Sequence, residues 1–258
     1  MRRVSSRKPS IALVTGAGSE GGIGFATAQR LVAAGLGVAI VATSDRIHHR
    51  AASLGPSATG YVCDLRDEAA VASLVAEVSA SGRIDVVVNN AGMTSTGAGT
   101  DAGRLVHELS MAEWDDTLRR NLTTAFAVCR AVVPGMRRRR YGRIVNVAST
   151  TGPLSAFERA GGYAAAKAGM VGLTRSLALE NGRFGITVNA VAPGWIDTPS
   201  ATAGERRAGA ASPVGRSGTA DEVAAAIAFL CSPDASYVSG HLLVVDGAND
   251  IVEDLAGR

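Results

Sequence analysis

Short apolar runs and longer amphipathic patterns alternate along nearly the whole chain. Apolar residues recur every three or four positions in the longer segments, which predicts helices, whereas the short runs rich in Val, Ile and Ala predict buried strands. The predicted strands lie at residues 11–14, 37–42, 60–63, 84–88, 143–148, 185–191 and 242–245, and the predicted helices at 23–34, 68–81, 111–136, 163–177 and 219–230. Strands that alternate with helices form a parallel sheet with a helical layer on each face. We therefore expect an α/β fold of the Rossmann type, with a doubly wound parallel sheet of about seven strands.

Domain organisation follows from the same pattern, because no linker or change of composition divides the chain. We expect a flexible basic arm at residues 1–9 and one domain at residues 10–258. Within this domain, residues 198–214 are small and polar, which predicts a flexible lid over a substrate site. The segment at 93–110 is rich in Gly, Ser and Thr, which predicts a long loop.

Charge and cysteine content exclude several classes of protein. The net charge of +3 is small for 258 residues, which argues against a nucleic-acid partner. The three cysteines are widely separated, so the sequence predicts neither a metal site nor a disulfide framework. No apolar run approaches the roughly 18 residues that a membrane-spanning helix needs. A cytoplasmic protein without a membrane partner is therefore expected.

The first predicted strand leads into a glycine-rich turn and then into a helix. In this context glycines let the backbone approach a pyrophosphate, and the helix N-terminus offers free N–H groups. The register of the turn is open. Residues 16–21 spell G-x-G-x-x-G, whereas Gly16, Gly22 and Gly24 suit a turn that ends where the helix begins. We favour the second register because the helical pattern starts at Ile23, and a glycine loop without a ligand is the alternative.

The end of the second predicted strand bears on the type of dinucleotide. Thr43, Ser44 and Arg46 offer hydroxyl and guanidinium groups that suit a ribose 2′-phosphate. Asp45 and Glu20 favour a free 2′-hydroxyl instead, depending on where they point. We expect NADP(H) in preference to NAD(H), and the alternative for Arg46 is a solvated charge in a loop.

Tyr163 and Lys167 are the strongest candidates for chemistry. Their four-residue spacing places both side chains on one face of a helix. An ammonium group near a phenol favours the phenolate and lowers the phenol's pKa toward neutrality, so that Tyr163 can exchange a proton with a reacting oxygen. The alternative is an ordinary helix with a buried tyrosine and a solvated lysine.

Other small or polar residues follow the predicted strands, at the edge where such sheets bind their ligands. Residues 89–92, with the sequence Asn-Asn-Ala-Gly, follow the fourth strand, and Ser149 follows the fifth. Pro193 and Gly194 follow the sixth. Asn121 lies within the helix predicted at 111–136, where an amide normally only caps a backbone group.

With these residues in place, the chain resembles a short-chain dehydrogenase/reductase over about residues 10–248. The family's motifs occur in order as the turn at 15–24, Asp64, residues 89–92, Asn121, Ser149, Tyr163 with Lys167, and Pro193 with Gly194. Residues 163–174, 185–197 and 215–247 are most similar to 3-oxoacyl-(acyl-carrier-protein) reductases. Two segments beside the substrate mouth depart from that subgroup, because 92–114 is longer and 198–214 looks shorter.

The resemblance implies a role for each candidate catalytic residue. Tyr163 would act as the general acid in the reductive direction. Lys167 would lower its pKa and bind the nicotinamide ribose. Ser149 would hydrogen-bond the substrate oxygen, and Asn121 would hold a water in a proton relay from Lys167 to solvent.

The resemblance also implies which residues would contact the dinucleotide. The pyrophosphate would be contacted by Gly16, Gly22, Ile23 and Gly24, and the adenine by Asp64 and Leu65. Asn90, Ala91 and Gly92 would lie along the adenine ribose. The nicotinamide would be contacted by Pro193, Gly194, Ile196 and Thr198. Ser19 is a further candidate for a phosphate contact. The turn is two residues longer than the family's usual pattern, so a contact by Ser19 or Glu20 does not follow directly.

The function that we expect is hydride transfer between NADP(H), or else NAD(H), and a ketone or 3-oxoacyl thioester. The first alternative is an NAD-dependent secondary-alcohol or sugar dehydrogenase. A non-catalytic nucleotide sensor is the second, although such a protein would be expected to have lost Tyr163, Lys167 or Ser149. The resemblance further implies a homotetramer, formed through the helix that begins at Met111, the Tyr163 helix and the final strand.

A run of four arginines at 137–140 suggests a macromolecular partner. These residues, together with Arg183, could receive the acidic face of an acyl-carrier protein that delivers the substrate. The alternative is that they only complement the C-terminus of the preceding helix, where cations are favourable.

Overall fold

Seven parallel strands form one sheet at the centre of the computed structural model, which describes residues 8–92 and 104–252. The strands are β1 (Ser10–Thr15), β2 (Gly37–Ala42), β3 (Ala58–Val62), β4 (Arg83–Asn89), β5 (Gly142–Val147), β6 (Ile186–Pro193) and β9 (Leu242–Val245). Their order is β3-β2-β1-β4-β5-β6-β9, and every neighbouring pair is parallel. This sheet confirms the predicted Rossmann-type fold: strands β2 and β3 are added on one side of β1, and β4 and the later strands of the sheet on the other.

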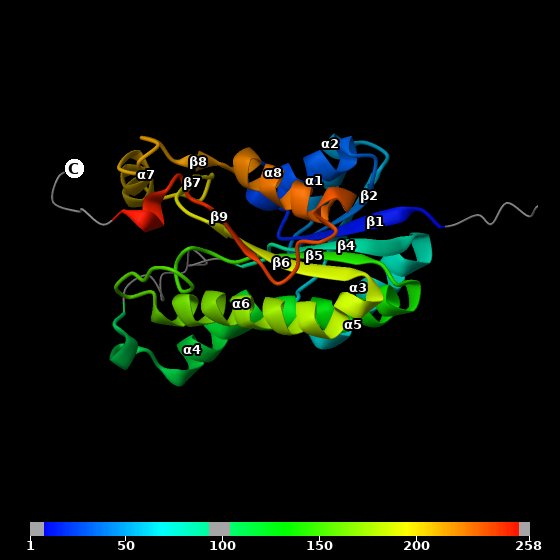
Figure 1. The fold of residues 1–258 in the computed structure, drawn as a ribbon, viewed down its shortest axis with the longest axis horizontal. Helices are drawn as coiled ribbons and strands as arrows, with labels where there is room; N and C mark the ends of the chain where they lie inside the picture. The colour runs from blue at the N-terminus through cyan, green and yellow to red at the C-terminus, as the bar shows by residue number, and fades with distance from the viewer. Residues whose placement is uncertain (1–7, 93–103, 253–258) are drawn as a thin grey trace, which may run out of the picture.

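Helices cover both faces of the sheet (Figure 1). One face carries α1 (Ile23–Ala33), α2 (Arg46–Leu54) and α8 (Ala220–Cys231), and the other carries α3 (Glu68–Ser81), α5 (Thr124–Arg139) and α6 (Gly161–Asn181). Side chains of β1 alternate between the two resulting cores. Leu13 packs on the α3 and α5 side, whereas Ala12 and Val14 pack on the α1 and α8 side. Because both faces are buried, the strands are apolar throughout, which is why short apolar runs located them.

The helix expected to run without a break from Met111 is interrupted. It consists of α4 (Met111–Leu118), a wide π-helical turn (Arg119–Thr123) and then α5. The Asn121 amide donates to the Thr117 carbonyl across this turn, at 3.1 Å. A π-turn adds one residue to the helix, and a regular apolar period resumes on either side of it, so that period did not predict it.

The segment at 198–214 is also more regular than expected. It contains helix α7 (Ala203–Ala210), which begins with a capping box in which Thr202 and Glu205 each bond the other's backbone N–H. Two short paired strands, β7 (Ile196–Asp197) and β8 (Gly218–Thr219), flank it. The sequence did not predict this helix because its alanines, glycines and arginines form no apolar stripe.

The remaining described segments are short. Single 3-10 turns lie at Val106–Glu108, Gly182–Phe184, Pro233–Ala235 and Asn249–Ile251. Of the expected N-terminal arm, residues 1–7 lie outside the described residues, whereas the Lys8 ammonium donates to the carbonyls of Ser79 and Ala80. Residues 93–103 of the predicted long loop also lie outside the described part.

Two features are absent from residues 8–92 and 104–252, namely a membrane-spanning helix and a cluster of metal ligands. None of the helices there combines the length and the apolar character that crossing a bilayer requires. That part of the chain also has no group of three or more His, Cys, Asp or Glu side chains that could hold a metal ion.

Candidate active site

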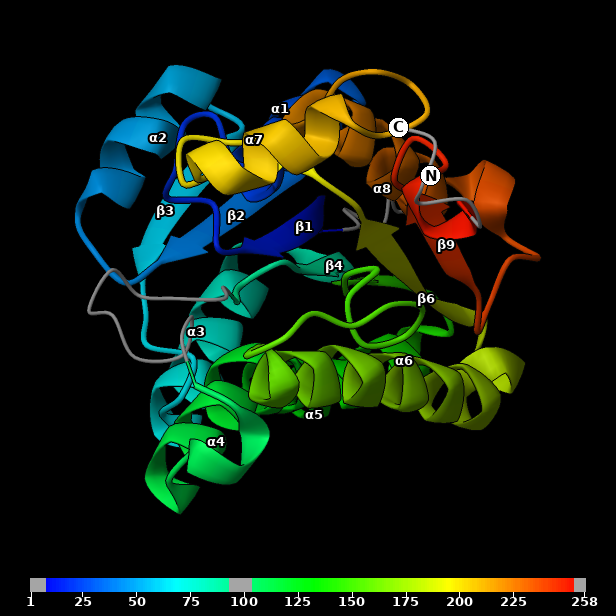
Figure 2. The ribbon, with the colours of Figure 1, turned by 90° about the vertical axis from the view of Figure 1, so that its left-hand side faces the viewer.

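The carboxyl ends of β4, β5 and β6 bring the predicted site residues to one edge of the sheet. Figure 2 looks onto this edge, with α7 on one side of it and α6 on the other. Adjacent parallel strands place the loops after them side by side. The Thr150 N–H donates to the Pro193 carbonyl at 3.1 Å, so the loop that carries Ser149 is fixed against the loop that carries Gly194.

Tyr163 and Lys167 lie one helical turn apart on α6, as their spacing predicts. The ammonium nitrogen of Lys167 is 5.5 Å from the centre of the Tyr163 ring. Lys167 is only 3% exposed, and its ammonium donates to the Val147 carbonyl at 2.9 Å. The carbonyl at the end of β5 therefore holds the lysine beside the tyrosine, a contact that the sequence reasoning missed because it involves only backbone.

The electrostatics of the pair differ from the expectation. Burial raises the pKa of the Tyr163 phenol above its usual value, and a hydrogen bond with Ser149 opposes that shift. The nearby Glu205 carboxylate on α7 adds a smaller upward effect on the same pKa. The expected lowering by Lys167 is wrong for the protein alone, because desolvation dominates at this position. Tyr163 is therefore held in its protonated form at neutral pH.

Burial lowers the pKa of Lys167 to about 8, from 10.5 in a solvated lysine. A buried ammonium loses hydration, so the folded protein binds this proton less tightly than the unfolded chain does. Between pH 8 and 10.5 the unfolded state binds more protons, so the free energy of unfolding rises with pH over this interval. The shift corresponds to about 3 kcal/mol.

We predict that the Lys167→Met variant lacks this pH-dependent contribution. The difference in free energy of unfolding between wild type and variant should be constant below about pH 8 and then rise in favour of wild type by up to about 3 kcal/mol toward pH 10.5. Chemical denaturation at a series of pH values measures it. A difference that does not change with pH would show that Lys167 is not a desolvated ammonium.

Asn121 and Gly92 complete the surroundings of Lys167. Gly92 has a φ of +150°, and a Cβ atom there would lie 2.7 Å from the Asn121 amide oxygen and 3.4 Å from the Lys167 nitrogen. Only glycine therefore fits between these two groups. The structure thus brings Asn121, Ser149, and the pair of Tyr163 and Lys167 on α6 to one place from three separate segments of the chain.

A clamp between the ends of β1 and β4 shapes the glycine turn. The Thr15 hydroxyl accepts hydrogen bonds from the backbone N–H groups of Asn90 and Ala91, each at 3.0 Å. The Asn90 amide donates to the carbonyls of Thr15 and Gly16. Asn90 thus holds together the loops after β1 and β4, at the point where the order in which strands join the sheet changes side. The role of Thr15 could not be predicted from the sequence, because its hydrogen-bond partners are distant in the chain.

The start of α1 fits a pyrophosphate. Its N-cap is Gly22, without a side-chain hydrogen bond to the helix, and no acidic residue lies in the first turn. The N–H groups at Ile23 and Gly24 are therefore free of side-chain caps, and the helix dipole adds positive potential there. A Cβ on Gly24 would lie 2.5 Å from the Asn90 amide nitrogen. These features support the register that ends at Gly24, while Ser19 contributes its carbonyl to the Gly22 N–H.

Arg46 lies over the glycine turn. It is the first residue of α2, not part of a loop, and its Nε atom is 3.0 Å from where a Cβ on Gly18 would stand. Glu20, which the sequence analysis considered as a residue that could favour a free 2′-hydroxyl, forms an ion pair with Arg50 at 2.8 Å. Among the described residues Arg46 has no acidic partner. Thr43 and Asp45 are exposed beside it, and Ser44 is partly buried.

Asp64 and Leu65 follow β3, at the position implied for the adenine. The Leu65 side chain is buried, whereas the Asp64 carboxylate is half exposed and forms an ion pair with Arg66 at 2.7 Å. Hydrogen bonds from Arg66 lower the pKa of Asp64, so the carboxylate stays ionised. Arg66 did not stand out in the sequence, because a charged residue in a loop is usually only solvated.

The residues that the resemblance implies for the nicotinamide lie in the segment after β6. The Gly194 N–H donates to the Val245 carbonyl at 3.0 Å, and Ile196 pairs with β8. The Thr198 hydroxyl is hydrogen-bonded to that of Ser200. A Cβ on Gly21 would lie 3.0 Å from Pro199, so the segment that leads into α7 reaches across to the glycine turn.

An aromatic pair lies at the loop that connects Ser149 to Tyr163. The rings of Phe157 and Trp195 are 5.1 Å apart and tilted by 58°. Phe157 lies in the loop between Ser149 and Tyr163, and Trp195 directly follows Gly194. Phe157 is 45% exposed, and Leu154 in the same loop is also exposed. The sequence reasoning missed this apolar surface, because loop aromatics give no periodic signal.

The arginines at 137–140 lie at the opposite edge of the sheet from Ser149. They end α5 just before β5 begins, whereas Ser149 follows the end of β5. Arg139 pairs with the buried Asp85 at 3.2 Å. The guanidinium groups of Arg137, Arg140 and Arg183 surround the Phe184 ring, at 4.1, 5.9 and 4.9 Å from its centre. A partner on this patch would not face the Ser149 site of the same chain.

Comparison with known proteins agrees with this geometry. A family model described as enoyl-(acyl carrier protein) reductase matches residues 16–248. The chain is 41% identical to the 3-oxoacyl-(acyl-carrier-protein) reductase FabG of Salmonella typhimurium over 243 residues, which cover 92% of this chain and 96% of that protein. It is 38% identical to the short-chain reductase NovJ of Streptomyces niveus, with 95% of each chain covered.

Solved structures give the same result. The crystal structure of levodione reductase superposes with a TM-score of 0.86 at 34% identity, over 95% of this chain and 99% of that one. The family model covers most of the chain, and the relatives exceed 30% identity over nearly their whole length. The protein is a nicotinamide-dependent oxidoreductase that belongs to the short-chain dehydrogenase/reductase family.

Proposed function

We propose that this enzyme reduces a ketone, in particular a 3-oxoacyl thioester, with NADPH. The observation that carries the proposal is the meeting of Ser149, Tyr163 and Lys167 at the edge of the sheet that also holds the glycine turn. The position of Arg46 over that turn supports NADPH as the cofactor. Similarity to reductases named for 3-oxoacyl substrates supports the thioester.

In this mechanism Ser149 and Tyr163 hold the carbonyl oxygen of the substrate by donating hydrogen bonds to it. A nicotinamide held against the segment after β6 would supply the hydride to the carbonyl carbon. As negative charge develops on the oxygen, Tyr163 gives up its proton, and Ser149 stabilises the remaining charge. The protonated state that burial favours for Tyr163 is the state that this direction of reaction needs.

Lys167 then stabilises the tyrosinate that forms. Its pKa of about 8 lets it exchange a proton near neutral pH more readily than a solvated lysine does. Asn121 stands next to it across Gly92 and would hold the water through which the proton returns from solvent. Lys167 thus stabilises the tyrosinate that forms during the reaction. It does not lower the pKa of Tyr163 in the resting protein.

The substrate side favours an apolar substituent over a sugar. Phe157 and Leu154, in the loop between Ser149 and Tyr163, present apolar surface together with Trp195, whose ring contacts Phe157. An alkyl or ring group next to the carbonyl would bury that surface, whereas a polyol would leave its hydroxyls facing it without partners. This observation argues against the sugar dehydrogenase alternative.

Initial rates with NADPH and with NADH, measured on an acetoacetyl thioester, test the proposal. Fast oxidation of NADPH is expected. Turnover with NADH alone would overturn the cofactor assignment and favour the NAD-dependent alcohol dehydrogenase. No turnover of the thioester with either cofactor would overturn the substrate assignment, and the absence of any turnover on ketones or secondary alcohols would favour the nucleotide sensor.

We also propose a homotetramer, formed through the helical segment from Met111 (α4 and α5), through α6 and through the final strand β9. Phe126 on α5 is 48% exposed and Leu179 on α6 is 88% exposed, so both helices present apolar side chains that a partner would cover. If α5 pairs antiparallel with its copy, the arginines at 137–140 of one chain lie near the Asn121 end of the other. A carrier protein on this patch would then deliver its substrate to the neighbouring site. Mass in solution tests the tetramer.

Neutralising three arginines tests carrier docking. We expect an Arg137→Gln, Arg138→Gln, Arg140→Gln variant to lose about tenfold in kcat/KM on an acyl-carrier-protein thioester, through lost charge attraction. Activity on a small-molecule thioester of the same acyl group should be unchanged. Arg139 is kept because it pairs with buried Asp85. Equal loss on both substrates would show that the arginines only complement the helix C-terminus.

A further inference from the structure

The turn that follows β9 packs against the segment that carries Gly194. A Cβ atom on Gly194 would lie 2.6 Å from the Cβ of Asp246, so only glycine fits there. The Asp246 carboxylate accepts hydrogen bonds from the backbone N–H groups of Ala248 and Asp250, at 2.9 and 2.8 Å. Asp246 therefore closes this turn and fixes the backbone of the 3-10 turn at Asn249–Ile251.

Asp250 reaches from this turn to residues 149–155, which we call the serine loop. Its carboxyl group lies within hydrogen-bonding reach of the Ser155 and Thr150 hydroxyls. The Oδ2 atom of Asp250 and the Oγ atom of Ser155 are both buried, and among the described residues neither has a hydrogen bond of standard geometry. Because buried polar atoms rarely stay unpaired, these two atoms are suited to share one hydrogen bond.

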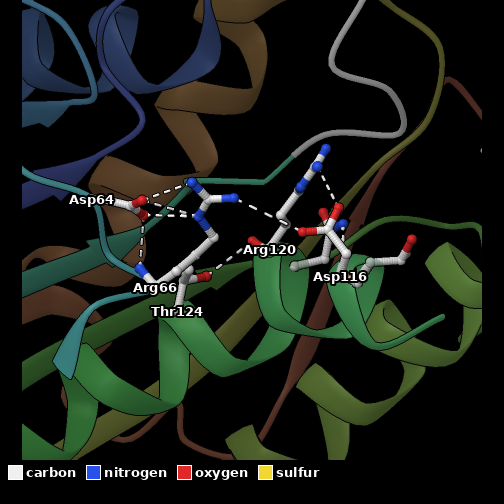
Figure 3. A network of polar contacts seen from close by, with 7 residues as sticks. Asp64, Arg66, Asp116, Arg120 and Thr124 are labelled. Carbon is white, nitrogen blue, oxygen red and sulfur yellow. Dashed lines mark hydrogen bonds and ion pairs between the residues drawn. The ribbon is translucent and has the colours of Figure 1, made fainter. Parts of the chain in front are cut away.

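Asp250 lies next to a second carboxyl group, that of Asp246. Burial raises the pKa of Asp250 above its usual value, the two hydroxyls of the serine loop oppose that rise, and Asp246 adds to it. Figure 3 shows a different arrangement, in which the guanidinium of Arg66 lies between Asp64 and Asp116. Among the described residues neither Asp246 nor Asp250 forms an ion pair. Asp250 thus acts on the serine loop as a hydrogen-bonding group and not through a paired charge.

Hydrogen bonds within the serine loop connect Ser155 to Ser149. The Ser155 N–H donates to the Thr150 carbonyl at 3.1 Å, and the Ser155 carbonyl accepts from the Gly152 N–H at 2.7 Å. The Ser149 hydroxyl accepts from the Thr151 N–H at 3.1 Å. The loop is therefore one compact hydrogen-bonded unit, and a group that fixes Ser155 and Thr150 also fixes the hydroxyl of Ser149.

We propose that Asp250 is a positioning residue for the reaction: its carboxyl group holds the serine loop so that the Ser149 hydroxyl meets the carbonyl oxygen of the substrate. The inference rests on the proposed role of Ser149 in ketone reduction. It goes beyond that role because Asp250 acts through Ser149 and not by a contact of its own with the substrate. The segment after β9 would therefore contribute to the rate of the reaction and not to the binding of the dinucleotide.

Steady-state kinetics of Asp250 variants, with NADPH and an acetoacetyl thioester, test this role. We expect Asp250→Ala to lower kcat about tenfold, because a small misplacement of a catalytic group slows the reaction strongly. The Kd for NADPH should stay within about twofold of wild type. Asp250→Asn keeps an oxygen that accepts from the serine loop and gains an amide N–H that can donate to Asp246. Its kcat should stay within about threefold of wild type.

Asp234→Ala is the matched control. Asp234 and Asp250 are each the second residue of a three-residue 3-10 turn, but Asp234 is exposed and lies in the turn at Pro233–Ala235. We expect this variant to keep the wild-type kcat. Thermal unfolding of each variant verifies that it is folded.

A double-mutant cycle with Ser149→Ala separates positioning from a general loss of structure. In that background the hydroxyl to be positioned is gone, so Asp250→Ala should lower kcat by less than about twofold. Equal losses in both backgrounds, a wild-type kcat in Asp250→Ala, or an Asp250→Asn enzyme as slow as Asp250→Ala would overturn the inference, while turnover by wild type still supports the proposed function. Absence of wild-type turnover with both NADPH and NADH would overturn both.

Discussion

Replacing Tyr163 by Phe should lower kcat about 1,000-fold while the Kd for NADPH stays within about threefold of wild type. The substitution removes only the hydroxyl, and general acid catalysis by one positioned group contributes roughly 100- to 10,000-fold. The ring remains on α6, above the Lys167 ammonium. Because the acid acts in the transition state, kcat and kcat/KM should fall together. Steady-state rates and fluorescence titration with NADPH measure the two quantities.

Ser149→Ala is the companion variant for this test. It also removes a hydroxyl that we propose to contact the carbonyl oxygen, but it leaves the proton donor in place, so the loss of kcat should be smaller. Ser149 also hydrogen-bonds Tyr163 and holds its pKa down, so the variant should shift the pH profile of kcat to higher pH. A Tyr163→Phe enzyme that kept the wild-type rate would exclude Tyr163 as the proton donor.

Replacing Arg46 by Ala should raise the Kd for NADPH about 10- to 100-fold and leave the Kd for NADH within about threefold. A guanidinium that binds a phosphate forms charge-assisted hydrogen bonds, whose loss costs about 1.5–3 kcal/mol. Only NADPH carries the 2′-phosphate, so only its binding should change. The selectivity ratio kcat/KM for NADPH over NADH, measured with one ketone, should fall by the same factor.

Arg50→Ala is the matched control for Arg46. Arg50 lies one turn further along α2, but its charge is paired with Glu20 and its guanidinium lies 5.9 Å from the centre of the Phe25 ring. We expect its loss to change NADPH selectivity less than about threefold. If both variants lose selectivity equally, the preference comes from the summed positive charge of α2. If neither does, the 2′-phosphate is not bound at this turn.

Much of this molecule followed from local pattern. The strands were predictable because a parallel sheet buried on both faces requires unbroken apolar runs, and α3 and β9 have the predicted bounds, Glu68–Ser81 and Leu242–Val245. The glycine turn and the spacing of Tyr163 and Lys167 were predictable because backbone conformation and helical geometry depend on near neighbours. Resemblance to a family added the roles of Ser149 and Asn121, which have no local signal.

Contacts between distant segments could not be predicted in this way. The π-turn at Asn121 and the helix α7 give no apolar period. The pKa of Tyr163 is raised because burial by the whole fold outweighs the neighbouring ammonium that the sequence suggested. The arginines at 137–140 lie in sequence near Ser149, yet the length of β5 separates them from it across the sheet.

The sequence by itself determined the order of elements, the fold class and the candidate chemistry, because these depend on residue type and short-range spacing. The tertiary structure decided which charges meet. It paired Glu20 with Arg50 and left Arg46 over Gly18, and it tied Asp64 to Arg66. The physical reason is that electrostatic energy depends on distance and burial in space, and neither quantity is encoded in the separation of two residues along the chain.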